Sequence, residues 1–454
     1  MIKFGTGGYR GNIETEFNKE TVKAISFALI KIINSNKLNR KVIIGYDFRF
    51  YSAEYSFYLA SILASNKIQV TLSKYACPTP VVMYHTMKED IDIGVMFTAS
   101  HNPASFNGIK IFTKGGIDAD VQFTELIERY ANSNLLYPIL EDVNISQKDL
   151  NLEYIEYLKD FIKIPKNKIR ILFDCLYGTG SITIPPLLNY YQLNCHIIHN
   201  EIDHNFGGFI PNPTAENLLK NVNSSYSNYD ICLGTDSDAD RLGILDENGH
   251  YIDANEILAV IYHYLLNKGD KGDIVKNIAT SVILDKLALK YDYKCHTVDV
   301  GFKNISSKML ETNALIGGES SGGLTIRNYL RGKDSTFSSL LFLQALAHSK
   351  LKPSQLIQKV KDEVNYQGFF KEITVNLKKT VDNSFFKKFQ NISFSFLSKI
   401  QLNNNLKFII NEDTWLLIRL SGTEPLLRLV CEGKNSDEVN EYLEITKKYI
   451  NSLK

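Results

Sequence analysis

The chain has 454 residues, of which 44% are hydrophobic and 22% are charged; this is the balance of an ordinary globular protein and excludes a disordered chain. Its length suggests about three domains, or four if one is small. The formal net charge is +1, so no basic excess points to nucleic acid. Without a long apolar stretch or an apolar N-terminal leader, we expect a cytoplasmic protein that binds neither nucleic acid nor membrane.

The first part of the chain alternates short apolar runs with helical patterns. Lys41–Asp47 and Ile68–Leu72 have the apolar residues of strands, and Ser52–Asn66 has helical spacing after a serine that can cap it. A second helix is expected at Thr79–Lys88, followed by the apolar run Ile91–Phe97. This order is typical of a parallel sheet with helices on its faces.

The same pattern restarts after a loop-rich stretch at 132–148, and again near Asp253. The end of the chain differs, because its apolar runs follow one another as in an α+β unit. We expect strands at 169–175, 229–234, 273–281, 294–300, 370–377, 414–422 and 426–433, and helices at 254–267, 333–349 and 436–453. These elements predict an α/β protein with domains at 1–145, 146–252, 253–366 and 367–454.

A first polar cluster, FTASHNPASFNGIK, follows the apolar run that ends at Phe97. In open α/β sheets, ligands bind beyond the carboxyl ends of the strands. The hydroxyl of Ser100 at such an end suits a nucleophile or a phosphoryl carrier. His101 flanks it, and Lys110 suits an acid/base or a phosphate clamp. The alternative is a simple turn in which Ser100 only caps the next element.

A second cluster, GTDSDADRLG, places Asp236, Asp238 and Asp240 directly after an expected strand. Three carboxylates in five residues repel one another, and hard oxygen ligands suit Mg²⁺. Arg241 follows and can hold an anion beside the metal. A calcium-binding EF-hand is disfavoured, because Arg241 stands where that loop needs glycine. A solvated acidic turn is the other alternative.

Three glycine-rich segments complete the candidates. LIGGESSGGLTIRN contains Glu319 and Ser321, which can bind sugar hydroxyls, or it is only a hairpin. IRLSGTEPLLRLVCEG offers guanidinium, hydroxyl and backbone N–H groups for a phosphate, or it is a turn with surface arginines. FGTGGYRG near the N-terminus brings Arg10 close to flexible backbone.

In this order and spacing, the five motifs resemble the α-D-phosphohexomutase family, which includes phosphoglucomutases, phosphomannomutases and phosphoglucosamine mutases. The resemblance runs from Phe4 to Gly433. It implies three similar α/β domains with mixed or parallel sheets and a smaller C-terminal α+β domain around a central cleft. The first would carry a phosphoserine loop, the second a metal-binding loop, the third a sugar-binding loop and the last a phosphate-binding loop.

The resemblance also implies roles for individual residues. Ser100 would be the phosphoserine, and its phosphate would join Asp236, Asp238 and Asp240 around Mg²⁺. The other catalytic residues would be His101, Lys110, Arg10 and Arg241, with Lys110 as general acid/base. Sugar binding would fall to Gly301, Lys303, Glu319 and Ser321. Phosphate binding would fall to Arg419, Ser421, Gly422, Thr423 and Arg428.

The implied reaction interconverts hexose 1-phosphate and hexose 6-phosphate through a bisphosphorylated sugar, with glucose 1,6-bisphosphate as activator. Its partner would be a small-molecule sugar phosphate, and the sequence leaves the oligomeric state open. Ser237 stands where many members have glycine, and Gly323 where several phosphomannomutases and phosphoglucosamine mutases have histidine. The second departure favours a phosphoglucomutase-like member, which would act on glucose phosphates or on both glucose and mannose phosphates.

Other substrates and classes stay open. A phosphoglucosamine mutase or a phosphopentomutase is the alternative within the reaction type, because fold similarity does not determine the substrate. A metal-dependent phosphatase would discharge the phosphoserine to water. A non-catalytic sugar-phosphate-binding protein would bind without turnover, although every expected catalytic position is filled here.

Overall fold

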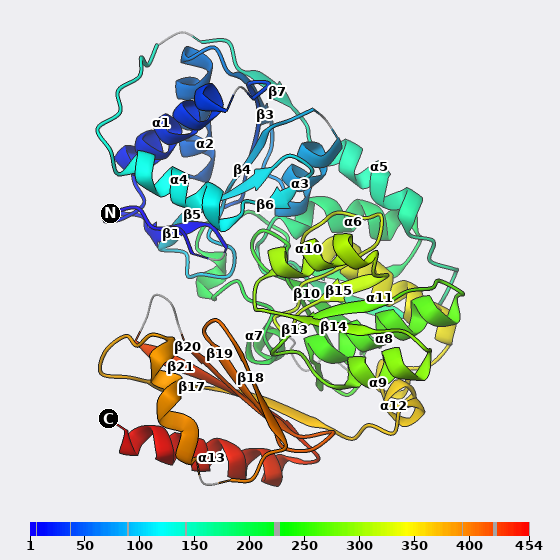
Figure 1. Ribbon diagram of the computed structural model, residues 1–454. Helices are drawn as coiled ribbons and strands as arrows, with labels where there is room; N and C mark the ends of the chain where they lie inside the picture. The colour runs from blue at the N-terminus through cyan, green and yellow to red at the C-terminus, as the bar shows by residue number, and fades with distance from the viewer. Residues whose placement is uncertain are drawn as a thin grey trace. The chain divides into compact units, whose positions relative to one another are not determined.

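The computed structural model describes residues 1–5, 7–36, 38–88, 90–140, 143–221, 228–392, 394–420 and 425–453. Strands within these residues form four sheets, coloured along the chain in Figure 1. The chain divides into two units by its contacts: Met1–Ile261 with Ser321–Leu356, and Tyr262–Ser320 with Ile357–Lys454. The expected mixture of α/β sheets and a C-terminal antiparallel unit is confirmed. The four domain boundaries stay a prediction.

The first sheet of the first unit has the order β1-β5-β4-β2-β3-β7, with β6 paired to β5. Strands β2, β3, β4 and β7 run parallel, whereas β5 and β1 run antiparallel to their neighbours, so the sheet is mixed. The strands are β1 (Tyr9–Asn12), β2 (Lys41–Tyr46), β3 (Gln69–Ser73), β4 (Ile93–Phe97), β5 (Phe106–Thr113), β6 (Ile117–Asp118) and β7 (Ser146–Lys148).

Helices pack on this sheet and bury its apolar residues. Every residue of β4 is buried, which explains its continuous apolar sequence. Helix α1 packs beside α2 and α4 (Figure 1), and the side chain of Asn18 caps its first turn. The helices are α1 (Lys19–Ser35), α2 (Ser52–Ser65), α3 (Thr79–Lys88) and α4 (Val121–Ala131).

The short strand β7 lies in the stretch 132–148 that the sequence predicts as loop. Its residues Ser146, Gln147 and Lys148 have no apolar pattern and little strand propensity. They form a strand because they extend the sheet in parallel beside β3. The backbone pairing at the sheet edge, and not the side chains, determines this element.

The second sheet, also in the first unit, has the order β12-β11-β10-β8-β9. Strands β8, β9 and β10 are parallel, and β11 turns back antiparallel to β10. The elements from this part of the chain are α5 (Asn151–Phe161), β8 (Arg170–Asp174), α6 (Gly180–Tyr190), β9 (Asn194–Ile198), η1 (Phe206–Gly208), α7 (Ala215–Asn221), β10 (Ile231–Thr235), β11 (Leu242–Leu245) and β12 (Tyr251–Ile252).

The chain next forms α8 (Ala254–Asn267), which spans the boundary between the units. The segment Ser321–Leu356 belongs to the first unit again. It contains β16 (Leu324–Ile326) and α11 (Ser335–Ser349). Asp334 caps α11 by accepting the N–H of Phe337 at 2.9 Å. No helix among the described residues is both long enough and apolar enough to cross a membrane.

The second unit combines parallel strands with an antiparallel sheet. Strands β14, β13 and β15 are parallel, and the last sheet has the order β17-β21-β20-β19-β18 with α13 against one face (Figure 1). Its elements are β13 (Ile274–Asn277), α9 (Ile283–Lys290), β14 (Cys295–Val298), α10 (Phe302–Thr312), β15 (Ile316–Gly318), α12 (Pro353–Glu363, which begins in the first unit), β17 (Phe369–Asn376), η3 (Asn383–Asn391), β18 (Ser398–Leu402), β19 (Asn405–Ile409), β20 (Trp415–Leu420), β21 (Leu426–Gly433) and α13 (Ser436–Ser452).

A buried lysine lies where the two parts of the second unit pack together. Lys407 on β19 is 5% exposed, its Nζ donates to the carbonyl of Ile278 at 2.9 Å, and it lies 3.6 Å from the centre of the Trp415 ring. Burial, with a smaller contribution from Lys276, lowers the pKa of Lys407 to about 7. Burial therefore favours the neutral form of the Lys407 side chain over the charged form.

We expect Lys407 to make stability depend on pH. The pKa of Lys407 is about 7 in the folded protein and about 10.4 in the unfolded chain. Between about pH 7 and about pH 10.4, Lys407 is therefore protonated in the unfolded chain but mostly neutral in the folded protein. The free energy of unfolding should therefore rise with pH across this window, by at most about 1.4 kcal/mol per pH unit, relative to Lys407→Met. Urea unfolding of both proteins at several pH values measures the difference. Parallel profiles would contradict the assignment.

Candidate active site

The Ser100 loop and the acidic loop meet inside the first unit. Ser100 follows β4, and Asp236 follows β10. The Oγ of Ser100 donates to Oδ2 of Asp236 at 2.6 Å, and the Oγ of Ser237 donates to the carbonyl of Ser100 at 2.7 Å. Ser100 is 1% exposed and has a φ of 51°, which is a left-handed backbone conformation. This conformation costs about 1–3 kcal/mol for a residue other than glycine, and such residues are concentrated at functional sites.

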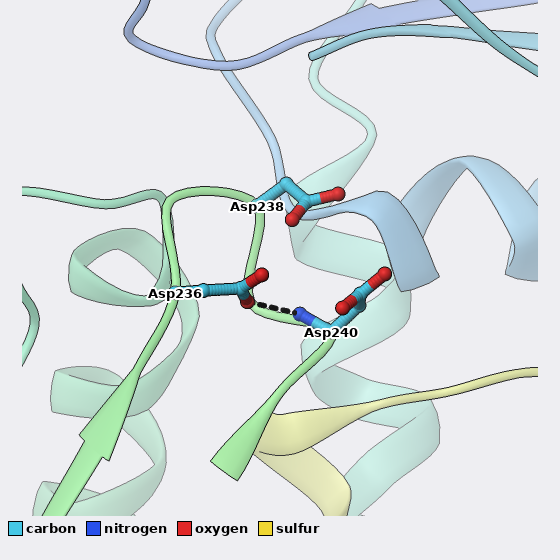
Figure 2. A group of neighbouring side chains, drawn as sticks. All are labelled: Asp236, Asp238 and Asp240. Carbon is cyan, nitrogen blue, oxygen red and sulfur yellow. Dashed lines mark hydrogen bonds between the residues drawn. The ribbon is translucent and has the colours of Figure 1, made fainter. Parts of the chain in front are cut away.

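The three aspartates of the acidic loop converge, as Figure 2 shows. All three are buried, and one ligand atom from each lies within 4.8 Å of the others. The loop is closed by the backbone N–H of Asp240, which donates to Oδ1 of Asp236 at 2.9 Å, and by that of Arg241 at 3.0 Å. The short-range turn thus directs the carboxylates toward one point.

Two lysines partly neutralise the triad. Nζ of Lys110, on β5, lies 2.5 Å from Oδ2 of Asp238 and 2.6 Å from Oδ2 of Asp240. Nζ of Lys333 lies 3.1 Å from Oδ2 of Asp240. Although burial acts in the opposite direction, the two carboxylates raise the pKa of Lys110, and the surrounding cations, with Lys110 the largest contributor, hold the pKa of Asp240 well below its usual range.

The triad has the properties of a divalent-cation site. Burial, and then the charges of Asp238 and Asp240, raise the pKa of Asp236 to about 8. Oδ1 of Asp238 and Oδ1 of Asp240 are buried and make no hydrogen bond with any described residue. Buried carboxylate oxygens without donors are costly unless a cation binds them. This donor set fits the oxygen ligands that Mg²⁺ prefers.

The remaining sequence-predicted residues of this region also gather here. Nη1 of Arg10, on β1, donates to Oδ1 of Asn102 at 2.9 Å in the Ser100 loop, and Nε of Arg241 lies 4.0 Å from Oδ1 of Asp240. Nδ1 of His101 lies 3.3 Å from Oγ of Ser100. Burial, followed by the charges of Arg241 and Arg10, lowers the pKa of His101 to about 2, so its imidazole is neutral.

Sequence reasoning missed two residues of this site, Arg49 and Lys333. Both stand next to recognisable elements: Arg49 follows the carboxyl end of β2, where ligand loops are expected, and Lys333 precedes the capping residue of α11. Neither lies in a recognised motif. Their partners are distant in sequence, so no local pattern reveals them.

Arg49 holds the Ser100 loop in place. Its side chain is fully buried and lies 3.3 Å from Asp47. Its guanidinium donates to the carbonyl of Ser100. It makes further hydrogen bonds of 2.6–2.9 Å to the carbonyls of Asn102, Pro103 and Phe106. A planar group with five donors can serve four carbonyls at once, which the single ammonium of lysine cannot.

We expect Arg49→Lys to reduce turnover at least about 10-fold and to lower the melting temperature, because the loop carbonyls lose their donors while the charge is kept. Steady-state kinetics and thermal unfolding measure both effects. Arg40→Lys is the matched control: Arg40 also donates to backbone carbonyls in the same sheet region, but away from Ser100. Wild-type activity and stability in Arg49→Lys would show that the loop does not need this residue.

The predicted sugar-binding residues are not brought together in one unit. Gly301 precedes α10 with a φ of 120°, and Lys303 lies in the first turn of that helix. Glu319 follows β15 and is 8% exposed, and Nδ2 of Asn277 lies 3.4 Å from its Oε2. Ser321 belongs to the first unit. Their role in binding sugar stays a prediction.

The predicted phosphate-binding arginines lie opposite each other on two neighbouring strands. Arg419 on β20 pairs with Arg428 on β21, so both side chains extend from the same face of the sheet. Burial, and then the charge of Arg428, lower the pKa of Arg419. Two like charges side by side favour an anion between them. Ser421, Gly422 and Thr423 lie outside the described residues.

Comparison with known proteins covers most of the chain. Four models of phosphoglucomutase/phosphomannomutase match it in order. They are alpha/beta/alpha domain I at residues 1–137, domain II at 152–249, domain III at 253–363 and the C-terminal domain at 372–447. Ser100 and Lys110 fall within the first match, and the acidic triad falls within the second.

Relatives and solved structures agree with this. The phosphoglucomutase/phosphomannomutase of Thermococcus kodakarensis is 28% identical over 97% of this chain and 97% of its own length. The phosphoglucosamine mutase of Ruminiclostridium cellulolyticum is 28% identical over 96% and 95%. A phosphoglucomutase/phosphomannomutase family protein from Burkholderia thailandensis has the same fold, with a TM-score of 0.84 at 20% identity over 99% and 98%. The chain belongs to the α-D-phosphohexomutase family, whose members are intramolecular phosphotransferases.

Proposed function

We propose that this phosphohexomutase interconverts the 1-phosphate and 6-phosphate of glucose, and also of mannose, through a phosphorylated Ser100. The hydrogen bond of 2.6 Å between Ser100 Oγ and Asp236 Oδ2 carries the proposal, because it places a buried hydroxyl at the edge of a cation site. Phosphoryl transfer needs chiefly positioning and charge neutralisation. Both requirements are met around this oxygen.

The chain's own residues suit each part of the transfer. Phosphorylated Ser100 would give its phosphoryl group to a sugar hydroxyl: the Oγ–P bond breaks, a sugar O–P bond forms, and the proton that the sugar hydroxyl loses balances the one that Oγ gains. Lys110 is an ammonium at neutral pH, because the carboxylates that pair with it raise its pKa, so it suits the role of proton donor to the departing Oγ. Arg10 and Arg241 lie beside the loops and suit the binding of the transferred group.

Magnesium would be held by Asp236, Asp238 and Asp240 together with the phosphate on Ser100. When bound, the ion supplies positive charge to the phosphoryl oxygens and so favours transfer. The bisphosphorylated sugar would then turn round and give its other phosphoryl group, the one that it already carried on arrival, back to Ser100, so glucose 1,6-bisphosphate should activate enzyme that lacks the phosphate on Ser100.

Arg419 on β20 and Arg428 on β21 are proposed to bind the phosphate group of the substrate that is not being transferred. We expect Arg419→Ala to raise KM at least about 10-fold with a smaller change in kcat, because a two-point contact with the phosphate is lost. Steady-state kinetics with the sugar phosphate measure this. Lys399→Ala, which removes an exposed cation from β18 of the same sheet, should leave KM unchanged. An unchanged KM in Arg419→Ala would remove it from the binding site.

Gly323 favours a phosphoglucomutase-like member of the family, because it replaces the histidine expected in several phosphomannomutases and phosphoglucosamine mutases. Phosphoglucosamine mutase is the second candidate, since several relatives carry that name at 28–29% identity, against 28% for the phosphoglucomutase/phosphomannomutase. A side-by-side assay separates them. The 1-phosphates of glucose, mannose and glucosamine are each incubated with Mg²⁺ and a trace of the matching 1,6-bisphosphate, and the 6-phosphate and free phosphate are both measured.

Each outcome has a distinct meaning. Glucose 6-phosphate without free phosphate supports the proposed reaction, and the relative rates rank the sugars. Turnover of glucosamine phosphate alone selects the second candidate. If none of the three hexose phosphates is turned over, ribose 1-phosphate is assayed in the same way, and its turnover selects a phosphopentomutase. Free phosphate as the main product would show a phosphatase. Binding without any turnover would show a sugar-phosphate-binding protein.

A further inference from the structure

A cavity of about 820 Å³ lies in the first unit, beside the segment that leads from β2 into α2. Its walls come from this segment, from the loop after β3, from the start of α5, from α6 and from the loop after β9. We call it the aromatic pocket, after five of its lining residues: Tyr46, Phe48, Phe50, Tyr51 and Tyr75. Its volume is in the range of pockets that bind small molecules.

The rim of the aromatic pocket exposes large apolar side chains. Tyr75 is 51% exposed, Leu152 is 62% exposed and Ile202 is 65% exposed, and all three line the cavity. Phe50 and Tyr51 are also partly exposed there. Apolar side chains grouped around a hollow indicate a binding site rather than the single exposed residues of an ordinary surface.

The charges of the lining residues select against anions. Glu54 and Asp149 line the pocket. The basic residue Arg49 is already paired with Asp47 and with the carbonyls of the Ser100 loop. His204 Nδ1 donates to the carbonyl of Phe48. A sugar phosphate would meet two carboxylates and no free guanidinium, so the pocket is unsuited to a second substrate molecule.

We propose that the aromatic pocket binds a small aromatic amine: a flat ring that packs on the aromatic side chains, and an ammonium group that lies toward the carboxylates of Glu54 and Asp149. The site lies directly behind the catalytic loop, because Arg49 both lines the pocket and holds the carbonyls of that loop. The proposal is independent of which sugar the enzyme uses.

Tryptamine is a suitable probe, because it has an indole ring and an ammonium group. We expect saturable binding to the full-length protein by calorimetry, with a dissociation constant of about 0.1–1 mM. Indole-3-acetate has a similar ring but a carboxylate, and should bind at least about 10-fold more weakly because Glu54 and Asp149 repel it.

Two variants locate the binding. Ala53→Trp places a large ring into the pocket from an exposed position on α2 and should abolish tryptamine binding without loss of fold. Glu54→Gln removes one of the two carboxylates and should weaken tryptamine binding about 3-fold while it narrows the difference between tryptamine and indole-3-acetate. Ala53 takes part in no step of the reaction, so turnover and melting temperature of Ala53→Trp report on its folding.

Three results would overturn the proposal. The first is the absence of saturable binding up to about 10 mM tryptamine, because the dissociation constant would then be well above the expected value of about 0.1–1 mM. The second is wild-type binding in a folded Ala53→Trp. The third is self-association of the wild type, seen by analytical ultracentrifugation and lost in Ala53→Trp, since a second copy of the chain would then cover this face.

Discussion

Replacing Ser100 with alanine is expected to reduce turnover at least about 1000-fold while substrate binding persists, because no oxygen remains to carry the phosphoryl group. The residues proposed to bind the sugar and its phosphate belong to other segments of the chain and are untouched by the change. Kinetics measure the loss of turnover, and calorimetry with glucose 6-phosphate measures the retained binding. Wild-type protein incubated with radiolabelled glucose 1,6-bisphosphate should become labelled, and the variant should not.

The fold should tolerate this substitution. Ser100 already has a left-handed backbone, which alanine adopts at similar cost, and the lost hydrogen bond to Asp236 contributes about 1 kcal/mol. Ser105→Ala is the matched control, because Ser105 is an exposed serine in the same loop. It should retain wild-type turnover. Residual activity in Ser100→Ala above about 10% of wild type would rule out Ser100 as the phosphoryl carrier.

Asp238→Asn is expected to raise the Mg²⁺ concentration needed for half-maximal activity at least about 10-fold, because the triad loses one of its negative charges. Oδ1 of Asp238 makes no hydrogen bond with any described residue, whereas Oδ2 accepts from Lys110 and Thr79. An asparagine of the same shape keeps an oxygen but not the charge. Activity measured across a Mg²⁺ titration gives the midpoint.

A readout without substrate supports the same prediction. A ligand that binds only the folded state raises the melting temperature, so Mg²⁺ should stabilise the wild type and stabilise Asp238→Asn less. Asp160→Asn removes an exposed carboxylate from α5 of the same unit and should behave as the wild type does. If Mg²⁺ stabilises Asp238→Asn as strongly as the wild type, the triad is not the metal site.

Several helices could be predicted accurately because their patterns are local. The expected helix at Thr79–Lys88 is α3, residues 254–267 are α8, and 436–453 match α13 to within one residue. Many other helices, α5 and α10 among them, were not predicted, and neither was β7. Their sequences mix polar and apolar residues, and packing against the sheets decides them.

The acidic loop is the part of the site that the sequence alone determined. Asp236, Asp238 and Asp240 alternate within five residues, and the local turn, closed by the N–H groups of Asp240 and Arg241, is enough to bring their carboxylates together. Ser100 could be singled out as well, because a polar residue after a buried strand lies at the ligand-binding edge of a sheet.

Only the tertiary structure decided which residues meet this loop. Ser100 and Asp236 are separated by 136 residues, and Lys110 and Asp238 by 128; Arg49 and Lys333 come from still other segments. Their approach depends on strand order and on how two sheets pack within the first unit. A sequence pattern records short-range geometry, whereas contacts between distant segments follow from the burial of whole sheets and helices, which no single motif encodes.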